Sequence, residues 1–318
     1  MKTIVGHLDQ LEQLSKAVSS KRVPNAYLFS GPKGVGKRLV SERFMQMVSC
    51  LSPNEKNEPC FQCRGCKKTV DRNHPDQFIV EPDGEKIKIG QIRALQSQLQ
   101  FHPLESSRKV AIIDDADRMN EAAANSLLKI LEEPPELTHF ILITSLPNAL
   151  LPTIRSRCQH LPFNPLNDEE LANYLSLNEG IPTKEAMRIA RFSGGSMGVA
   201  ISIDTQFVDD ILGRFTTIMH KASTADIIET SQIWANEDPD RIRLLLDLLM
   251  SWYRDLLRFQ TTGNASASIH PEAIKLASHI VPSRMDKAIS EIAHARFSLE
   301  ANANKQLMFE NLLFSLTQ

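Results

Sequence analysis

Five short segments with the pattern of strands recur along the first half of the chain, the first four built around apolar runs, and helical patterns separate most of them. They lie at 26–30, 77–80, 108–117, 138–145 and 159–163. Runs of this length, bounded by turn-forming residues, are typical of buried strands, whereas the segments between them carry apolar residues three and four positions apart. Strands that alternate with helices form a parallel sheet with helices on both faces. The pattern therefore predicts an α/β domain.

The pattern changes after residue 165, where the chain becomes almost wholly helical. This change predicts three domains, at 1–165, 166–205 and 206–318, of which the second is small and the last two are helical. In the last domain, apolar residues follow an i, i+3, i+4 series from Ile242 to Phe259. The series predicts the core of a helical bundle; the alternative is that part of this stripe packs against a partner subunit.

The first predicted strand leads into a glycine-rich segment with the pattern G-x-x-x-x-G-K, and a helical pattern follows at 39–47. Glycines let backbone N–H groups turn inward around phosphates, a helix N-terminus adds partial positive charge, and the lysine reaches the terminal phosphates. We therefore expect a nucleotide-binding loop. Its residues are Gly31, Pro32, Lys33, Gly34, Val35, Gly36 and Lys37.

Three further residues belong to this predicted nucleotide site, and two of them depart from a hydrolytic one. The position after Lys37 normally supplies a hydroxyl to Mg²⁺, but Arg38 has no oxygen to offer and repels a cation. Asp114 follows a predicted strand and is the expected magnesium ligand. Asp115 stands next, where a longer Glu commonly positions water. The carboxylates could instead cap the helix that follows, and binding of ATP and Mg²⁺ stays open.

Four of the five cysteines are clustered with the spacing Cys-x9-Cys-x2-Cys-x2-Cys. Thiolates in such tight spacing suit tetrahedral zinc, and a site closed by four thiolates has no open position for catalysis. The sequence thus predicts structural Zn²⁺ on Cys50, Cys60, Cys63 and Cys66. The alternative is a set of free thiols or a redox pair.

Composition narrows the class of protein only slightly. The chain has 318 residues, of which 42% are hydrophobic, and a formal net charge of -2. This balance argues against a nucleic-acid-binding surface that covers the whole protein. No apolar run reaches membrane-spanning length and nothing resembles a signal peptide, so we expect a soluble, cytoplasmic protein without a membrane partner.

Several motifs in order resemble one known family. They are the loop at 31–37, the cysteine cluster at 50–66, His74-Pro-Asp76, the run 125–135 (NSLLKILEEPP) and Ser156-Arg-Cys158. Together they are similar to the clamp-loader branch of the AAA+ ATPases. The resemblance implies an AAA+ P-loop domain with an inserted zinc module at 50–66, a helical lid at 166–205 and a helical collar for oligomerisation at 206–318.

The resemblance also implies partners and roles. In this family five subunits form a ring that opens a sliding clamp and places it on primed DNA for DNA polymerase III, so subunits of gamma/tau and delta type are the implied partners in a hetero-pentamer. Arg157 in Ser-Arg-Cys is the implied arginine finger, acting in trans on a neighbour's nucleotide. Thr144 stands at the first-sensor position, and Gly198 stands where ATPase subunits carry a second sensor arginine.

These departures favour a chain that hydrolyses ATP weakly or not at all and supplies Arg157 to a neighbour. A surface salt bridge is the other interpretation of Arg157. Two other functions stay open: an active clamp-loader ATPase of gamma/tau type that uses Lys37 and Asp114, and a zinc-stabilised DNA-binding module. No polymerase site is discernible, so polymerase activity would belong to the whole holoenzyme.

Overall fold

The computed structural model describes residues 3–55, 57–221, 223–263, 270, 282–301 and 303–317. Its backbone divides into two compact units, Met1–Ile201 and Ser202–Gln318. The predicted division into three domains, with boundaries at 165 and 205, stays a prediction.

A five-stranded parallel sheet forms the centre of the first unit, as the apolar pattern predicted. Its order is β2-β3-β4-β1-β5, and each neighbouring pair runs parallel. The central pair is in register from Ala26 opposite Phe140 to Ser30 opposite Thr144. The strands are β1 (Ala26–Ser30), β2 (Gln77–Val80), β3 (Lys109–Ile113), β4 (Thr138–Thr144) and β5 (Gln159–Pro162).

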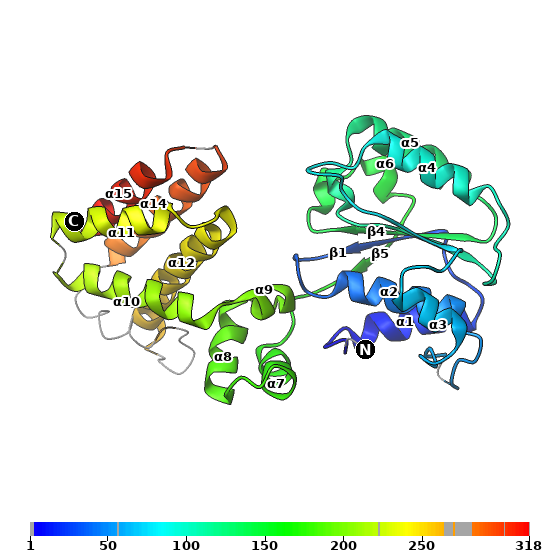
Figure 1. Ribbon diagram of the computed structural model, residues 1–318, viewed down its shortest axis with the longest axis horizontal. Helices are drawn as coiled ribbons and strands as arrows, with labels where there is room; N and C mark the ends of the chain where they lie inside the picture. Colours follow the sequence, from blue (N-terminus) through cyan, green and yellow to red (C-terminus); the bar gives the residue numbers. More distant parts are fainter. Residues whose placement is uncertain are drawn as a thin grey trace. The chain divides into compact units, whose positions relative to one another are not determined.

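Helices cover both faces of this sheet because its central strands are apolar on both sides (Figure 1). One face carries Tyr27 and Phe29 of β1 and packs against α1 (Leu8–Ser19) and α2 (Lys37–Ser49), with α3 (Arg64–Val70) against α2. The other face carries Ala26 and Leu28 and packs against α4 (Ile89–Leu99), α5 (Glu121–Glu132) and α6 (Pro152–Arg155). Side chains that alternate along β1 thus contribute to two hydrophobic cores, one on each face of the sheet.

Parallel strands place their carboxyl ends at one edge of the sheet, where ligands of open α/β sheets bind. Gly31 follows β1, Glu81 follows β2, Asp114 follows β3, and Thr144 ends β4. Two short 3-10 helices, η1 (Ala116–Arg118) and η2 (Pro147–Ala149), lie just beyond β3 and β4. The first unit ends with α7 (Asp168–Asn178), α8 (Thr183–Phe192) and α9 (Met197–Ser202).

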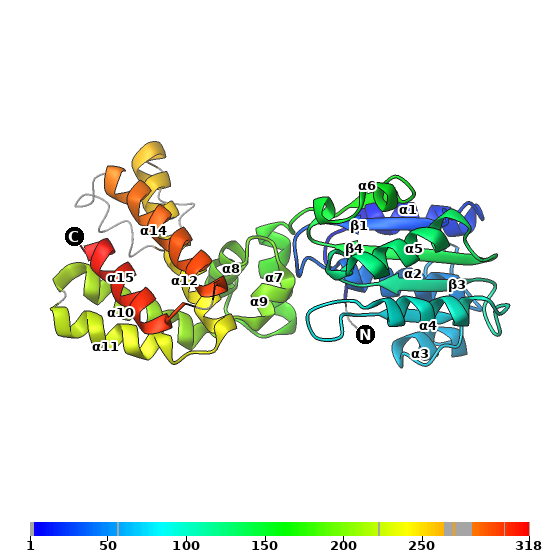
Figure 2. The ribbon, with the colours of Figure 1, turned by 90° about the horizontal axis from the view of Figure 1, so that it is seen from above.

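The second unit is helical (Figure 2). The predicted stripe on α12 is buried from Ile242 to Leu256, and within it Trp252 packs edge to face on Phe215 of α10. The stripe is therefore core, as its periodicity predicted. Among the residues that the structure describes, no helix combines the length and apolar character needed to cross a membrane. The helices described are α10 (Thr205–Lys221), α11 (Thr224–Ala235), α12 (Pro239–Thr262), α14 (Pro282–Glu300) and α15 (Lys305–Thr317).

Candidate functional site

The glycine-rich loop joins β1 to α2, where the sequence predicted a phosphate-binding site. Gly34 and Gly36 adopt φ of 78° and 113°, which favours glycine. At Gly31, a Cβ would lie 2.2 Å from the carbonyl oxygen of Phe163, so only glycine permits this approach. The sequence therefore builds the turn that a phosphate cradle needs, and α2 begins at Lys37.

Lys37 does not point into open space but folds back onto its own loop. Its Nζ donates to the carbonyl oxygens of Gly31 at 2.6 Å and Pro32 at 2.7 Å. Burial lowers the pKa of Lys37, while the nearby carboxylates of Asp114, Asp115 and Asp117 act in the opposite direction. The ammonium group that would hold terminal phosphates is thus engaged by the loop itself.

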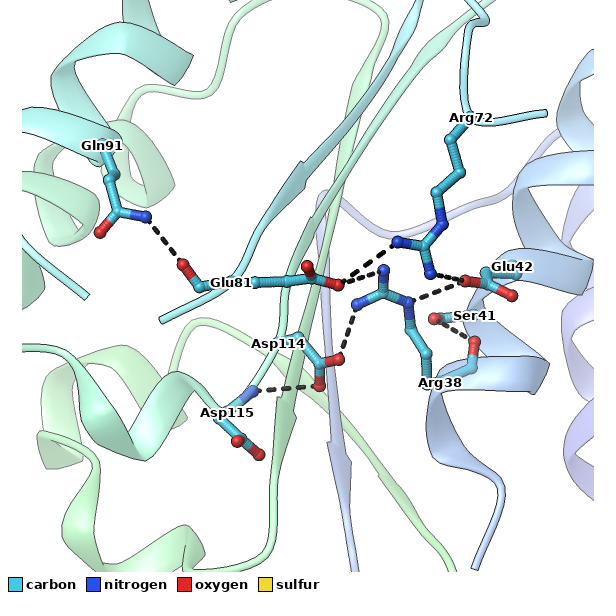
Figure 3. A network of polar contacts seen from close by, with 8 residues as sticks. All are labelled: Arg38, Ser41, Glu42, Arg72, Glu81, Gln91, Asp114 and Asp115. Atoms are coloured by element: carbon cyan, nitrogen blue, oxygen red, sulfur yellow. Dashed lines mark hydrogen bonds and ion pairs between the residues drawn. The ribbon is translucent and has the colours of Figure 1, made fainter. Parts of the chain in front are cut away.

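Arg38 lies at the centre of an ion-pair network, which Figure 3 shows. Its guanidinium contacts Asp114 at 2.6 Å, Glu81 at 2.7 Å and Glu42 at 3.0 Å. Burial disfavours the charged form of Arg38, but these three carboxylates outweigh it and raise its pKa. Arg72 extends the network to Glu42 at 3.4 Å and Glu81 at 3.9 Å. The Arg38 guanidinium is therefore already paired with Asp114, the carboxylate that was expected to bind magnesium.

The network around Arg38 also affects the pKa of Asp114. Burial raises the pKa of Asp114, and the repulsion of Asp115 adds to this, while Arg38 opposes both. Asp115 itself has φ of 47° and turns its backbone N–H to Asp114 Oδ1 at 3.1 Å. Its carboxylate lies 3.7 Å from Arg118. Asp114 is thus the member of this pair that faces Arg38.

Thr144 is fully buried at the end of β4. Its hydroxyl donates to Asp117 and accepts the backbone N–H of Leu146 at 2.9 Å. The hydroxyl therefore donates its proton and accepts one hydrogen bond within the chain. Asp117 had no role in the sequence interpretation, although it lies in the same carboxylate cluster after β3.

The segment from Gly195 to Gly198 lies directly on the glycine-rich loop. Gly198 N–H donates to the carbonyl oxygen of Gly34 at 2.9 Å, and Ser196 Oγ donates to that of Lys33 at 2.9 Å. A Cβ on Gly198 would lie 3.0 Å from Gly34 Cα. The sequence suggested only that Gly198 lacks a sensing side chain; its small size also permits this close backbone contact.

The N-terminal segment closes the same loop from another side. His7 Nε2 lies 2.8 Å from the carbonyl oxygen of Val35, and its ring packs edge to face on Phe163 at 4.9 Å between centroids. Burial lowers the pKa of His7, which favours the neutral ring that this packing requires. The loop is thus held by contacts from three distant segments.

The four predicted metal ligands come together. Their sulfur atoms lie within 4.8 Å of one another, close to the separation of about 4 Å that four bonds of about 2.3 Å to one tetrahedral ion impose. Burial opposes the thiolate of Cys63, but backbone N–H groups of Cys66 and Leu51 donate to its sulfur and lower its pKa to about 6. The cluster of Cys50, Cys60, Cys63 and Cys66 can hold a metal ion.

Arg157 lies on the surface beyond α6, apart from the network around Arg38. Its guanidinium donates to the carbonyl oxygen of Thr153 at 2.9 Å and pairs with Glu132 at 2.8 Å. The side chain is 36% exposed. The surface salt bridge considered from the sequence is therefore present, on a side chain that stays partly exposed.

Two family models match most of the sequence. Residues 6–167 match the model described as "DNA polymerase III, delta subunit", and residues 213–318 match a second model, which describes the C-terminal part of that subunit. The DNA polymerase III subunit delta' of Bacillus subtilis is 32% identical over 316 residues, covering 97% of this chain and 95% of that protein. The chain belongs to the delta' family of DNA polymerase III subunits. The resemblance in the motifs is confirmed.

Two further relatives extend this result. The delta' subunit of Escherichia coli is 28% identical and covers 96% of this delta' family member and 92% of its own length. The tau subunit of Bacillus subtilis is 30% identical over 81% of this chain but only 50% of tau. The match to these two delta' subunits is therefore nearly end to end, and the match to tau is partial.

In this delta' family member, the structure brings most of the predicted site residues together. The glycine-rich loop, Arg38 and Asp114 meet at one edge of the sheet, and the four cysteines form one cluster. The sequence interpretation missed Glu42, Glu81 and Arg72. Glu42 could have been found from its i, i+4 spacing to Arg38, and Glu81 from its position directly after β2.

Proposed function

We propose that this chain is a clamp-loader subunit of DNA polymerase III that does not hydrolyse ATP efficiently and supplies Arg157 to the nucleotide of a neighbouring subunit. Membership of the delta' family supports the general role, and the implied partners are subunits of gamma/tau and delta type. The sliding clamp and primed DNA would be contacted through the complex. The observation that carries the catalytic part is the contact between Arg38 and Asp114 at 2.6 Å.

A hydrolytic site needs magnesium between the nucleotide and a carboxylate. Here Asp114 already has a permanent cation, and Mg²⁺ would have to displace a guanidinium that two more carboxylates hold. Lys37 would have to leave Gly31 and Pro32, and Ser196 and Gly198 cover the loop. If ATP binds, Gly31–Lys37 would cradle its phosphates, but the groups that support hydrolysis are engaged elsewhere.

The trans role of Arg157 is supported by its exposure and by the chemistry of its side chain. A guanidinium presents a rigid fork of donors that matches phosphate, and an arginine finger contributes about 10³–10⁵ in turnover. Arg157 lies on a surface formed by α5 and α6, outside its own nucleotide loop. It can therefore act on a nucleotide bound to another subunit.

The experiment is ATP turnover of the reconstituted complex with clamp and primed DNA. Arg157→Ala is expected to abolish turnover at the neighbouring site while the complex still assembles, and Arg157→Lys should not restore it because the fork is lost. Arg93→Ala, which removes an exposed arginine from α4, is the control. Unchanged turnover with Arg157→Ala would remove the finger role. ATP hydrolysis by the purified chain that Lys37→Ala abolishes would establish the gamma/tau-type ATPase instead.

We propose zinc as the ion of the four-cysteine cluster, with a structural role. The cluster is tied to the sheet because Gln77 of β2 bonds both Ser49 of α2, at 2.7 Å, and Thr69 of α3, at 2.9 Å. The purified chain should contain about one equivalent of Zn²⁺, and Cys60→Ser should release it and expose the other thiols to alkylation. A metal-free chain with four reactive thiols would contradict this assignment.

A further inference from the structure

Within the described part of the chain, two acceptors hold Arg157, one from the backbone and one from a side chain. The Thr153 carbonyl oxygen accepts from Nη1 at 2.9 Å, and Glu132 Oε1 lies 2.8 Å from Nη2. The carbonyl belongs to the backbone of α6, so no side-chain substitution deletes it. Glu132 is therefore the group that side-chain substitution can remove.

The backbones that carry this pair are fixed by the core. Glu132 is the last residue of α5, and Ile130 and Leu131 just before it are buried. Ile154 of α6 is fully buried in the same cluster. The two side chains, by contrast, lie at the surface with 36% and 44% of their area exposed. Two helices fixed by the core therefore carry a weak, exposed ion pair, in which Arg157 can exchange Glu132 for another anion.

We propose that Glu132 is a positioning residue that holds Arg157 against its own chain and releases it to the nucleotide phosphates of the neighbouring subunit. The inference rests on the proposed trans role of Arg157. An exposed pair gains little from its own attraction, whereas phosphate oxygens carry more charge and accept two donors of the fork. Arg157 can therefore exchange the Glu132 carboxylate for phosphate at a small cost in free energy.

The ion pair between Glu132 and Arg157 has to break before Arg157 binds the neighbour's nucleotide. It therefore lowers the apparent affinity for that nucleotide by the free energy of the pair. An exposed pair is worth at most about 1 kcal/mol, which corresponds to no more than about fivefold. Glu132→Gln should therefore tighten binding of a non-hydrolysable ATP analogue to the assembled complex by about 1.5- to fivefold and lower the KM for ATP equally. kcat should stay unchanged, because Glu132 does not touch the bound phosphates.

Three comparisons isolate this effect from a loss of structure. Glu133→Gln removes the same charge one residue further along and should leave affinity unchanged, and Glu132→Asp, which keeps the carboxylate, should stay near the wild type. In an Arg157→Ala background, Glu132→Gln should have no effect, because nothing is left to release. The thermal unfolding midpoint should not move in either Glu132 variant.

The opposite results overturn the inference. An unchanged or raised KM with Glu132→Gln, a fall in kcat, or an effect that persists without Arg157 would each show that Glu132 does not hold the arginine in this way. The proposed function fails separately, when Arg157→Ala leaves turnover unchanged. A complex that needs Arg157 but ignores Glu132→Gln therefore retains the proposed function and refutes this inference alone.

Discussion

The ion-pair network around Arg38 can be tested by removing its guanidinium. Arg38→Ala leaves Asp114, Glu81 and Glu42 near one another without the cation that joins them. Breaking a fully buried pair costs about 3–5 kcal/mol and breaking an exposed one about 0–1 kcal/mol. Arg38 is 19% exposed and Asp114 24%, so we expect a loss of about 2 kcal/mol in the free energy of unfolding.

The pH dependence of this loss has a defined sign. Burial and Asp115 already raise the pKa of Asp114 above its ordinary value, and without Arg38 it rises further. An acid with a raised pKa in the folded state destabilises that state above the pKa and ceases to do so once protonated. The cost of Arg38→Ala should therefore be largest near neutral pH and shrink as the pH falls into the acidic range in which Asp114 becomes protonated.

Urea unfolding of the purified chain measures this, and Arg72→Ala is the matched control. Arg72 contacts Glu42 and Glu81 but is 59% exposed, so its loss should cost no more than about 1 kcal/mol. Arg38→Ser, which supplies a hydroxyl and frees Asp114, should gain stability from added Mg²⁺, while the wild type should not. Equal losses for Arg38→Ala and Arg72→Ala, or equal stabilisation of the wild type by Mg²⁺, would refute this reasoning.

Two further substitutions probe contacts that position the site. Gly198→Ala should destabilise the chain by about 1 kcal/mol because its Cβ would meet Gly34 Cα at 3.0 Å. The control is Gly90→Ala on α4, where the Cβ meets nothing within 4 Å and the change should be neutral or stabilising. A gain of stability in Gly198→Ala would contradict the close contact. Asp76→Asn should cost about 2–4 kcal/mol near neutral pH, since the buried carboxylate accepts the N–H groups of Leu104, Glu105 and Ser106 at 2.6–2.8 Å. Burial opposes the charge of Asp76, but these bonds lower its pKa, so the difference from the wild type should persist until pH falls below about 4 and then narrow; a difference that is independent of pH in acid would argue against a charged Asp76.

Four of the strands could be predicted from the sequence because each is built around a short apolar run. The exception is β5 at the edge of the sheet, where only Leu161 is buried and the apolar signal is weak. The glycine-rich loop and the four cysteines were found from spacing alone, since the chain between their members is too short to separate them. The identity of Arg38 predicted the loss of a magnesium ligand. It did not predict that Arg38 binds three carboxylates. Glu81 and Asp114 follow β2 and β3, and they come close to Arg38 only because of the order of the strands in the folded sheet.

Contacts between distant segments account for most of what the sequence could not reveal. Gly34 and Gly198 are far apart in the chain, and no local pattern shows that their backbones touch. The same holds for His7 and Val35. The partner of Arg157 was likewise open, because an exposed arginine has several carboxylates within reach and its choice depends on how α5 and α6 pack.

The two arginines differ in a way that suits opposite roles. Arg38 is 19% exposed and bound by three carboxylates, so its release would leave a cluster of negative charge uncompensated. Because this cation is part of the chain, the charge of Asp114 is balanced without magnesium. Arg157 is more exposed and, among the residues that the structure describes, pairs with one carboxylate, so its release costs little. This difference supports the proposed function, in which Arg38 stays bound to its carboxylates while Arg157 is released to the nucleotide of a neighbouring subunit.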